Sequence, residues 1–537
     1  MKKRFSNIKE TLLKQGARVL LVAMAIPALS QCTDLDETPY TSISPGNFYK
    51  SARDIEIALN GVYSRIGDMV SSGNYNMRLE VMTEFNSPAY AKDDVEKWSA
   101  WLNVNNADMA ITVWPTGFDI INRANIVLGH APNIEMDEAV RKQYMGEAYF
   151  LKAMANFHLM RLYGRLPIPE SYTSGDSELT IPRKSLEETY AHIIECLELA
   201  ESYLPAKNEY SKDTDIWRAS KGAAQGLLAK VYLYRASMQG NSSDYTKVKE
   251  YCTKLMSSGI YGLEPNFEDL WFWYNTENKF GIESVFEYSF GQVSGCYNNL
   301  HVMLGINVTD PELGCYMYRR MGPSIPHYLS YAANDARMAT FLDEYIDKNG
   351  NRCWFDPEDK GFYPNPRPSV QLNNWTTASP GNIKYYDRTP ASANLQLPAA
   401  NIYGIRYADV LLMFAEAENQ LNGPTAEALS AFNAVRTRAG LDALTTGDKQ
   451  EFDDFIYRER GWEFVGEAQL YFDALRTGRL AANVKAHLID GKQKGYYMYD
   501  YDPGFLPTKD FLWKIPQGDL DSNSALEQNP DNVSASL

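Results

Sequence analysis

The stretch from residue 407 to residue 439, YADVLLMFAEAENQLNGPTAEALSAFNAVRTRA, contains two helical patterns in direct succession. Apolar and small residues recur at the three- and four-residue spacings of a helix face, first over 407–421 and again over 426–439. Ala-rich helices in adjacent pairs are typical of helix-hairpin arrays. The stretch therefore predicts a mostly α fold.

Similar patterns lie on both sides of this pair. Further helices are predicted over 55–66, 141–163, 186–204, 218–238, 247–258 and 452–475. Ser185 and Glu188 form a capping-box pattern before the third of these. No strict 34-residue repeat is present, so the array is tetratricopeptide-like in architecture only.

The middle of the chain is different. Residues 271–375 contain 20 aromatic residues but few helical stretches, and Gly, Pro and Asn interrupt them. A long irregular segment is usually functional or disordered, and this many aromatic side chains argue against disorder. We expect a loop-rich insertion over 271–400, with short β pieces near 284–290. It would join helical regions at 32–270 and 401–537 in one compact body.

The charge balance is acidic. The 537 residues include 52 Lys and Arg against 68 Asp and Glu, a net charge of −16. Without residues 1–31, which carry six basic residues and one acidic residue, the net charge is −21. This balance argues against a nucleic-acid partner and, through repulsion, disfavours a polyanionic glycan unless a local patch opposes it.

The N-terminus has the pattern of a secretion signal. A basic segment precedes an apolar run over 19–28, which is too short to span a bilayer. Leu29-Ser30-Gln31-Cys32 resembles the lipobox of bacterial lipoproteins, although Gln31 stands where Gly, Ala or Ser is usual. We expect residues 1–31 to be removed and Cys32 to carry the lipid anchor; the alternative is an ordinary signal peptide. Two acyl chains would hold the protein stably on a membrane.

The other cysteines do not form a recognisable framework. Five remain after Cys32, with wide spacings and no CxxC pair, which argues against a disulfide scaffold or a zinc site. We expect Cys196 and Cys252 to be buried thiols in helices. A bridge between Cys296 and Cys315 stays open.

No catalytic motif is present. The sequence lacks GxSxG, HExxH, GxGxxG and a P-loop, and its six His residues are scattered. Glu459, Glu463 and Glu467 lie four apart on one predicted helix face. They would form either a like-charge cluster with raised pKa values or, as we expect, a structural ion network with arginines 458, 460 and 476.

One calcium pattern is present. Asp347, Asn349, Asn351 and Glu358 fall at positions one, three, five and twelve of an EF-hand-like spacing, but Arg352 stands where that loop needs Gly. A plain turn around Asn349-Gly350 is the favoured interpretation. We therefore predict no cofactor, with calcium as the alternative.

Several motifs in order resemble the SusD/RagB family of outer-membrane nutrient-binding lipoproteins. They are GEAYFLKA (146–153), LYGRLP (162–167), RASKGAAQGLLAKVYL (218–233), RYADVLLMFAEAE (406–418), NAVRTRAGL (433–441), IYRERGWEFVGEAQLYFDALRTGR (456–479), WKIP (513–516) and QNP (528–530). The departures are local: Gln469, Leu470 and Ala474 replace more usual residues.

The resemblance implies binding rather than catalysis. Such proteins lie on the cell surface, capture a nutrient, most often an oligosaccharide, and deliver it to a TonB-dependent outer-membrane transporter. The helical array would pack on the transporter, while loops carry the ligand site. Peptide binding is one alternative, and a surface glycoside hydrolase, whose carboxylates need not be close in sequence, is another.

Sugar rings bind to flat aromatic faces with planar polar groups around them. Two segments of the kind this family uses carry such side chains. The predicted ligand contacts are Trp98, Trp101 and Asn103 in the early segment, and Trp271, Trp273, Tyr274, Tyr297, Trp354 and Trp375 in the middle one. The stretch YYMYDY (496–501) is a weaker candidate, or faces the transporter.

Overall fold

In a computed structural model of the chain, the structure describes residues 48–71, 73–88, 98, 101, 104–105, 112–173, 180–271, 279–291, 298, 300, 304, 321–346, 349–356, 358, 361–364, 380–386, 399–490 and 505–534. The predicted signal peptide (1–31), Cys32 and the Cys296–Cys315 pair lie outside these residues. Within them, no helix is long and apolar enough to cross a membrane.

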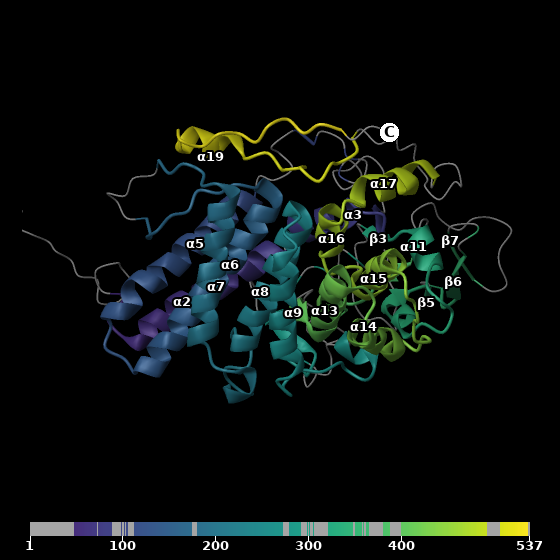
Figure 1. The fold of residues 1–537 in the computed structure, drawn as a ribbon, viewed down its shortest axis with the longest axis horizontal. Helices are drawn as coiled ribbons and strands as arrows, with labels where there is room; N and C mark the ends of the chain where they lie inside the picture. Colours follow the sequence, from purple (N-terminus) through teal and green to yellow (C-terminus); the bar gives the residue numbers. More distant parts are fainter. Residues whose placement is uncertain are drawn as a thin grey trace, which may run out of the picture.

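The first half of the fold is an array of helices, each packed against the next (Figure 1). Its members are α2 (Ala52–Ser71), α5 (Val113–His130), α6 (Glu138–Tyr163), α7 (Leu186–Tyr203), α8 (Lys221–Gln239) and α9 (Ser243–Met256). The array continues into α13 (Tyr407–Asn422) and α14 (Ala426–Arg438), which α9 joins by packing against α13. The predicted mostly α, tetratricopeptide-like arrangement is confirmed.

Local sequence signals set the helix ends. The Asp137 carboxylate accepts hydrogen bonds from two backbone amides at the start of α6, and the predicted capping box of Ser185 and Glu188 is present at α7. Gly240 ends α8 in the left-handed conformation, which Gly adopts without steric cost. These caps explain why most helix positions could be predicted.

One predicted helix is two helices. In place of a helix over 452–475, α15 (Lys449–Phe464) ends before a short irregular segment, and α16 (Leu470–Arg476) follows. Gly466 and Ala468 in that segment both have positive φ angles, of 86° and 55°. The chain then forms α17 (Leu480–Lys485) and a π-helical turn η7 (Ala486–Asp490).

The strands are short and scattered, as predicted for the middle of the chain. β2 (Ser284–Tyr288), close to the predicted β piece, pairs antiparallel with β9 (Ile402–Arg406), which leads directly into α13. β5 (Glu344–Ile346), β6 (Arg352–Asp356) and β7 (Gly361–Pro364) form one small sheet. The remaining pairs join β1 (Asn86–Pro88) to β3 (Met321–Pro323) and β4 (Phe341–Leu342) to β8 (Gly381–Asn382).

Short helical pieces complete the described part. They are α3 (Gly73–Val81), α11 (Ile325–Leu329) and α19 (Gln517–Ser522), with 3₁₀ turns η2 (Ala131–Asn133), η3 (Lys207–Glu209), η4 (Phe267–Leu270) and η6 (Ala336–Thr340). The segment that carries α19 lies across one end of the helical array (Figure 1). The Asn529 amide fastens it there by donating hydrogen bonds to the carbonyl oxygens of Tyr163, at 3.0 Å, and Trp513, at 2.8 Å.

Candidate functional site

Helix α15 has two faces with different chemistry, and the inner face carries the predicted row of glutamates. Glu463 lies fully buried between three guanidinium groups, those of Arg337, Arg406 and Arg438. Although burial opposes ionisation, these charges hold the pKa of Glu463 well below its usual range. The row is thus a structural ion network, as expected, and not a cluster with raised pKa values.

The cations in this network differ from those expected. Arg458 hydrogen-bonds the Asp454 carbonyl oxygen, while Arg460 pairs with Asp409 and Asp473. The partners of the glutamates come instead from distant segments: Arg337, Lys384, Arg406, Arg436 and Arg438.

Glu467 also departs from the predicted helix face, because it lies beyond the end of α15. Its carboxylate accepts hydrogen bonds from the Arg406 Nε and Nη2 groups, each at 2.9 Å. Glu80 holds the same irregular segment from the other side by accepting backbone hydrogen bonds from Gly466, at 3.1 Å, and Ala468. These contacts explain why the helical pattern is broken there.

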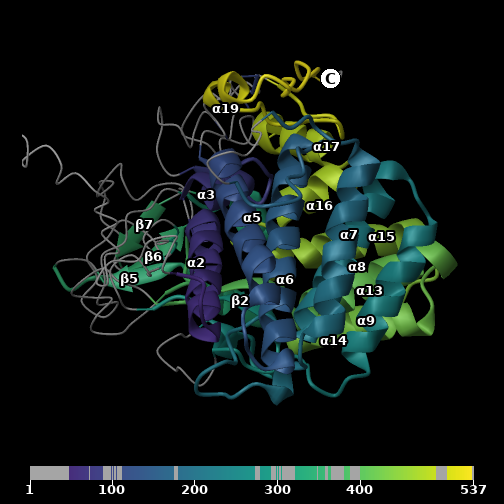
Figure 2. The ribbon, with the colours of Figure 1, turned by 90° about the vertical axis from the view of Figure 1, so that its left-hand side faces the viewer.

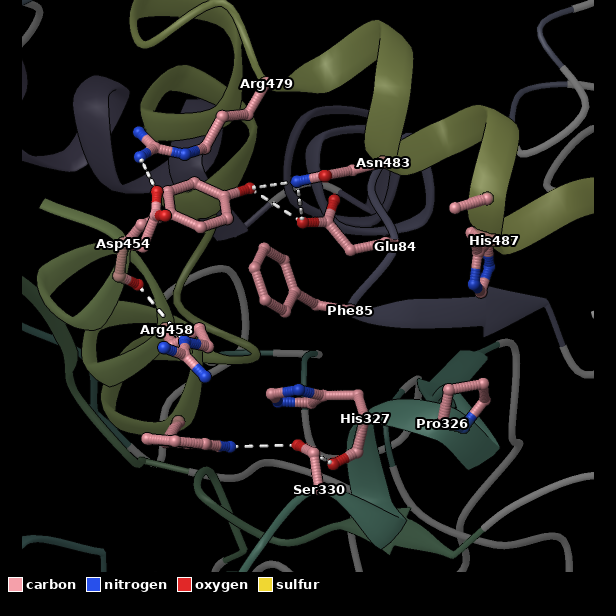
Figure 3. Close-up of a pocket in the computed structure, with 13 residues that line it drawn as sticks. Glu84, Phe85, Pro326, His327, Ser330, Asp454, Arg458, Arg479, Asn483 and His487 are labelled. Carbon is pink, nitrogen blue, oxygen red and sulfur yellow. Dashed lines mark hydrogen bonds and ion pairs between the residues drawn. The ribbon is translucent and has the colours of Figure 1, made fainter. Parts of the chain in front are cut away.

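The outer face of α15 borders a cavity of about 560 Å³ (Figure 3). This volume falls within the range of about 300–1,000 Å³ that small-molecule sites occupy. The walls come from the α3–β1 connection, α11, α15, α17 and η7. The lining residues are Glu84, Phe85, Pro326, His327, Ser330, Asp454, Tyr457, Arg458, Trp462, Arg479, Asn483, Ala486 and His487.

Glu84 is the most unusual polar group in this cavity. Its Oε1 atom accepts hydrogen bonds from the Tyr457 hydroxyl, at 2.7 Å, and the Asn483 amide, at 2.6 Å (Figure 3). Its Oε2 atom is buried and has no hydrogen-bond partner. Burial raises the pKa of Glu84 in spite of the two bonds at Oε1. An unpaired buried oxygen is costly, so a small shift of the Glu84 side chain that brings this atom to a donor on a ligand would be favoured.

Aromatic rings form much of the wall. The Phe85 ring lies edge-on to the His327 ring, with centroids 5.0 Å apart, and 5.9 Å from the Tyr457 ring. Trp462 is half-buried, and its indole Nε1 donates a 2.9 Å hydrogen bond to the Ser330 hydroxyl. That bond fixes the indole plane at the cavity wall.

The cavity carries little net charge. Burial, with the nearby Lys384 and Arg337 charges, lowers the pKa of His327 to about 3, and burial alone lowers the pKa of His487 to about 3. Both rings are therefore neutral at neutral pH. Arg479 pairs with Asp454 at 2.6 Å. Arg458 also lines the cavity, with its guanidinium bonded to the Asp454 carbonyl oxygen. A wall of rings with one amide and few charges suits an uncharged, hydroxyl-rich ligand.

With this geometry established, comparison with known proteins places the chain. Residues 35–233 match a family model described as "Starch-binding associating with outer membrane", and residues 325–531 match one described as "SusD family". Together the two models cover most of the chain. The chain belongs to the SusD family. The resemblance inferred from its motifs is thus confirmed.

Individual relatives agree with this assignment. This SusD-family protein is 27% identical to a SusD-like protein from Formosa agariphila, over 93% of this chain and 96% of the relative. A SusD homologue from Bacteroides thetaiotaomicron has the same fold, with a TM-score of 0.76 and 23% identity over 90% of this chain and 98% of the other. The surface glycan-binding protein A from Bacteroides uniformis gives a TM-score of 0.69 and 25% identity, covering 89% and 99%.

The early tryptophans of this SusD-family chain lie in packed surroundings. Trp101 is 1% exposed, and its ring centroid is 5.1 Å from that of Phe511. Trp98 is 7% exposed, and the Arg78 Cζ atom lies over its ring, 4.1 Å from the ring centroid. Neither lines the cavity at α15. The structure gives both rings a packing role, and their contact with ligand stays a prediction.

The middle aromatics divide in the same way. Trp271 is 1% exposed and lies against the ion network, with Lys384 Nζ 4.7 Å from its ring centroid. Trp354 on β6 is 42% exposed and available for contact, but it does not line the cavity. The other candidates, Asn103, Trp273, Tyr274, Tyr297 and Trp375, lie outside the described residues, as does the 496–501 stretch.

The calcium pattern gains no support from the described part of the chain. Asp347 lies outside it, and the residues inside it contain no group of three His, Cys, Asp or Glu side chains that could hold a metal ion. Asn349 and Gly350 lie between the antiparallel strands β5 and β6, and Gly350 has a φ of 82°. This is the turn that the sequence favoured.

The cavity itself was missed by sequence reasoning. Its walls come from segments hundreds of residues apart, which no spacing rule joins. One signal was available: Asp454, Tyr457 and Arg458 recur at the three- and four-residue spacings of one helix face, on the side of α15 away from Glu459 and Glu463.

Proposed function

We propose that this SusD-family protein binds an oligosaccharide in the cavity at the outer face of α15. The observation that carries the proposal is the combination of aromatic walls with the unpaired Oε2 atom of Glu84. Aromatic rings offer rigid contact area to the C–H face of a sugar, and a carboxylate oxygen accepts a hydrogen bond from its hydroxyl.

The relatives support this assignment. One matched family model is described as starch-binding, and a structural neighbour at 25% identity is named a surface glycan-binding protein. We extend the proposal to delivery of the bound glycan to a TonB-dependent transporter, with lipid-anchored attachment to the outer membrane through Cys32. Membership of the SusD family and the lipobox-like sequence support these two parts.

Binding without cleavage is the proposed activity. Asp454 is held in an ion pair with Arg479, so among the described lining residues Glu84 alone offers a buried, unpaired carboxylate oxygen. A glycosidase needs two carboxyl groups in complementary roles. The arrangement thus favours capture of a glycan over its hydrolysis.

The test is isothermal titration of the purified protein, with Cys32 replaced, against neutral oligosaccharides and peptides. We expect binding to one neutral glycan class, and chromatography should recover that glycan uncut. Binding to peptides alone would contradict the proposal, and so would the appearance of new reducing ends.

A further inference from the structure

A second cavity, of about 370 Å³, lies in the helical array between α5, α6, α7 and the residues that follow Leu166. These three helices lie side by side in Figure 2. The cavity shares no lining residue with the cavity at α15. It is therefore a separate place for a ligand.

A buried lysine lines this cavity. Lys152 is only 5% exposed, and its ammonium group forms no hydrogen bond or ion pair within the described part of the chain. Burial lowers its pKa, and the Glu195 and Glu170 carboxylates, which lie beyond ion-pair distance, offset this only in part. Because Lys152 lines the cavity and is largely removed from solvent, its ammonium group would be stabilised by an oxygen acceptor on a ligand, above all an anionic one.

The neighbouring thiol does not supply that charge. Burial raises the pKa of Cys196 to about 11, so the thiol stays protonated near neutral pH. His192, whose Nε2 atom is 3.7 Å from the Cys196 Sγ atom, has its pKa lowered to about 4 by burial and is neutral. The site therefore has one cationic group inside and the uncharged Cys196 and His192 side chains beside it, with the Glu170 and Glu195 carboxylates also in its lining.

Tyr172 forms another wall, and two further rings stack behind it. The Tyr172 ring lies 5.2 Å from the His130 ring, which is itself stacked 4.2 Å from the Tyr49 ring. Gly129 makes room for this arrangement, because a Cβ atom there would lie 2.8 Å from the Tyr172 ring. Asn125 fixes the adjoining backbone by donating to the carbonyl oxygens of Pro169 and Ser171, each at 3.2 Å.

From this geometry we propose a second binding site that accepts a sugar residue bearing one carboxylate, such as a uronate. The carboxylate would pair with Lys152, and the ring would lie along Tyr172. Glu170 and Glu195 are exposed at the rim, where they accept hydrogen bonds from hydroxyls and repel a densely charged polyanion. The site thus complements, and does not depend on, neutral-glycan binding at α15.

The experiment titrates the protein with sodium glucuronate, glucose and N-acetylalanine. We expect glucuronate to bind at least tenfold more tightly than glucose, because only glucuronate supplies the counter-charge. N-acetylalanine has a carboxylate but no sugar ring, so it should bind no more tightly than glucose. Preferential binding of N-acetylalanine would overturn the sugar assignment.

Variants locate the binding. Lys152→Met should weaken glucuronate binding at least tenfold while keeping or raising the melting temperature, because an unpaired buried charge is removed. Lys142→Met is the matched control: this lysine is exposed on the same helix, and its replacement should leave binding unchanged. Tyr172→Ala provides an independent variant and should also weaken binding. Unchanged glucuronate affinity in both Lys152→Met and Tyr172→Ala would overturn the proposal.

Discussion

Buried carboxylates lie beside both faces of α15, but they differ in how completely they are paired. On the inner face, Glu463 is surrounded by three guanidinium groups, and Arg406 is fully buried with three carboxylates as partners. Beside the outer face, Glu84 lines the cavity, and one of its carboxylate oxygens is buried without a partner. Both oxygens of each carboxylate on the inner face have a partner within the protein, whereas one oxygen of Glu84 has none.

This difference separates structural from functional charge. A network in which every carboxylate is paired stabilises one arrangement of the backbone, since removing one member leaves the others as buried charges without a partner. An incompletely paired group in a cavity gains when a ligand supplies the missing donor. A shifted pKa alone would not distinguish a structural charge from a functional one. The presence or absence of a partner for each buried oxygen does.

The largest expected effect comes from breaking the inner face. Arg406→Met leaves the carboxylates of Glu283, Glu463 and Glu467 short of a shared partner, so the free energy of unfolding should fall by about 3–5 kcal/mol. Urea denaturation measures the change. Arg458→Met on the exposed face is the control. Equal losses of unfolding free energy in the two variants would show that the network does not stabilise the fold.

A pH effect should come from Glu80, which holds the segment after α15. Burial raises the pKa of Glu80 to about 7, from an ordinary value of 4.5. A raised carboxyl pKa means that the folded state retains a proton the unfolded state releases. The resulting stabilisation is full below about pH 4.5 and is lost as pH rises to 7, about 3 kcal/mol in all. Urea denaturation across this pH range should show that Glu80→Gln removes this part of the pH dependence; an unchanged slope in the variant would contradict the assignment.

On the outer face, the expected effect is on binding. Trp462→Ala should weaken oligosaccharide binding by about 1–3 kcal/mol, because a fixed ring face is lost. Trp217→Ala is the matched control, since that indole is also half-buried and donates a hydrogen bond, 2.7 Å long, to the Thr214 carbonyl oxygen, away from the cavity. Titration calorimetry on both variants compares them, and equal affinities would remove Trp462 from the site.

The smallest expected effect belongs to Arg458. Its exposed guanidinium lies 4.4 Å from the Phe455 ring centroid and takes no part in the inner network. Arg458→Ala should change stability by less than about 0.5 kcal/mol. Because the ligand is expected to be neutral, its affinity should depend little on salt in either the wild type or the variant, as titration at two ionic strengths would show. A strong salt dependence in the wild type alone would indicate that the ligand is anionic.

The helices could be predicted because their signals are local. The caps at Asp137 and Ser185 and the glycine at position 240 act within a few residues of the helix ends. The break after Phe464 could not be predicted, because the apolar pattern continues through it. Distant groups, Glu80 and Arg406, hold the chain away from the helix there.

The candidate site was less predictable for a related reason. A tryptophan in an irregular segment can be core or contact surface, and composition does not separate the two. Trp101 and Trp271 are buried. Trp462, which lies in a helix and was not among the predicted ligand contacts, lines the cavity. The ion network was anticipated at its glutamates, but its cations come from segments up to 126 residues away in sequence.

The central claim is that the ligand binds at the outer face of α15. The most direct measurement is a crystal structure of the protein with the oligosaccharide that titration selects. We predict a sugar ring against Trp462, with a hydroxyl donating a hydrogen bond to the Glu84 Oε2 atom. A glycan bound elsewhere, with the cavity occupied by solvent alone, would contradict the account.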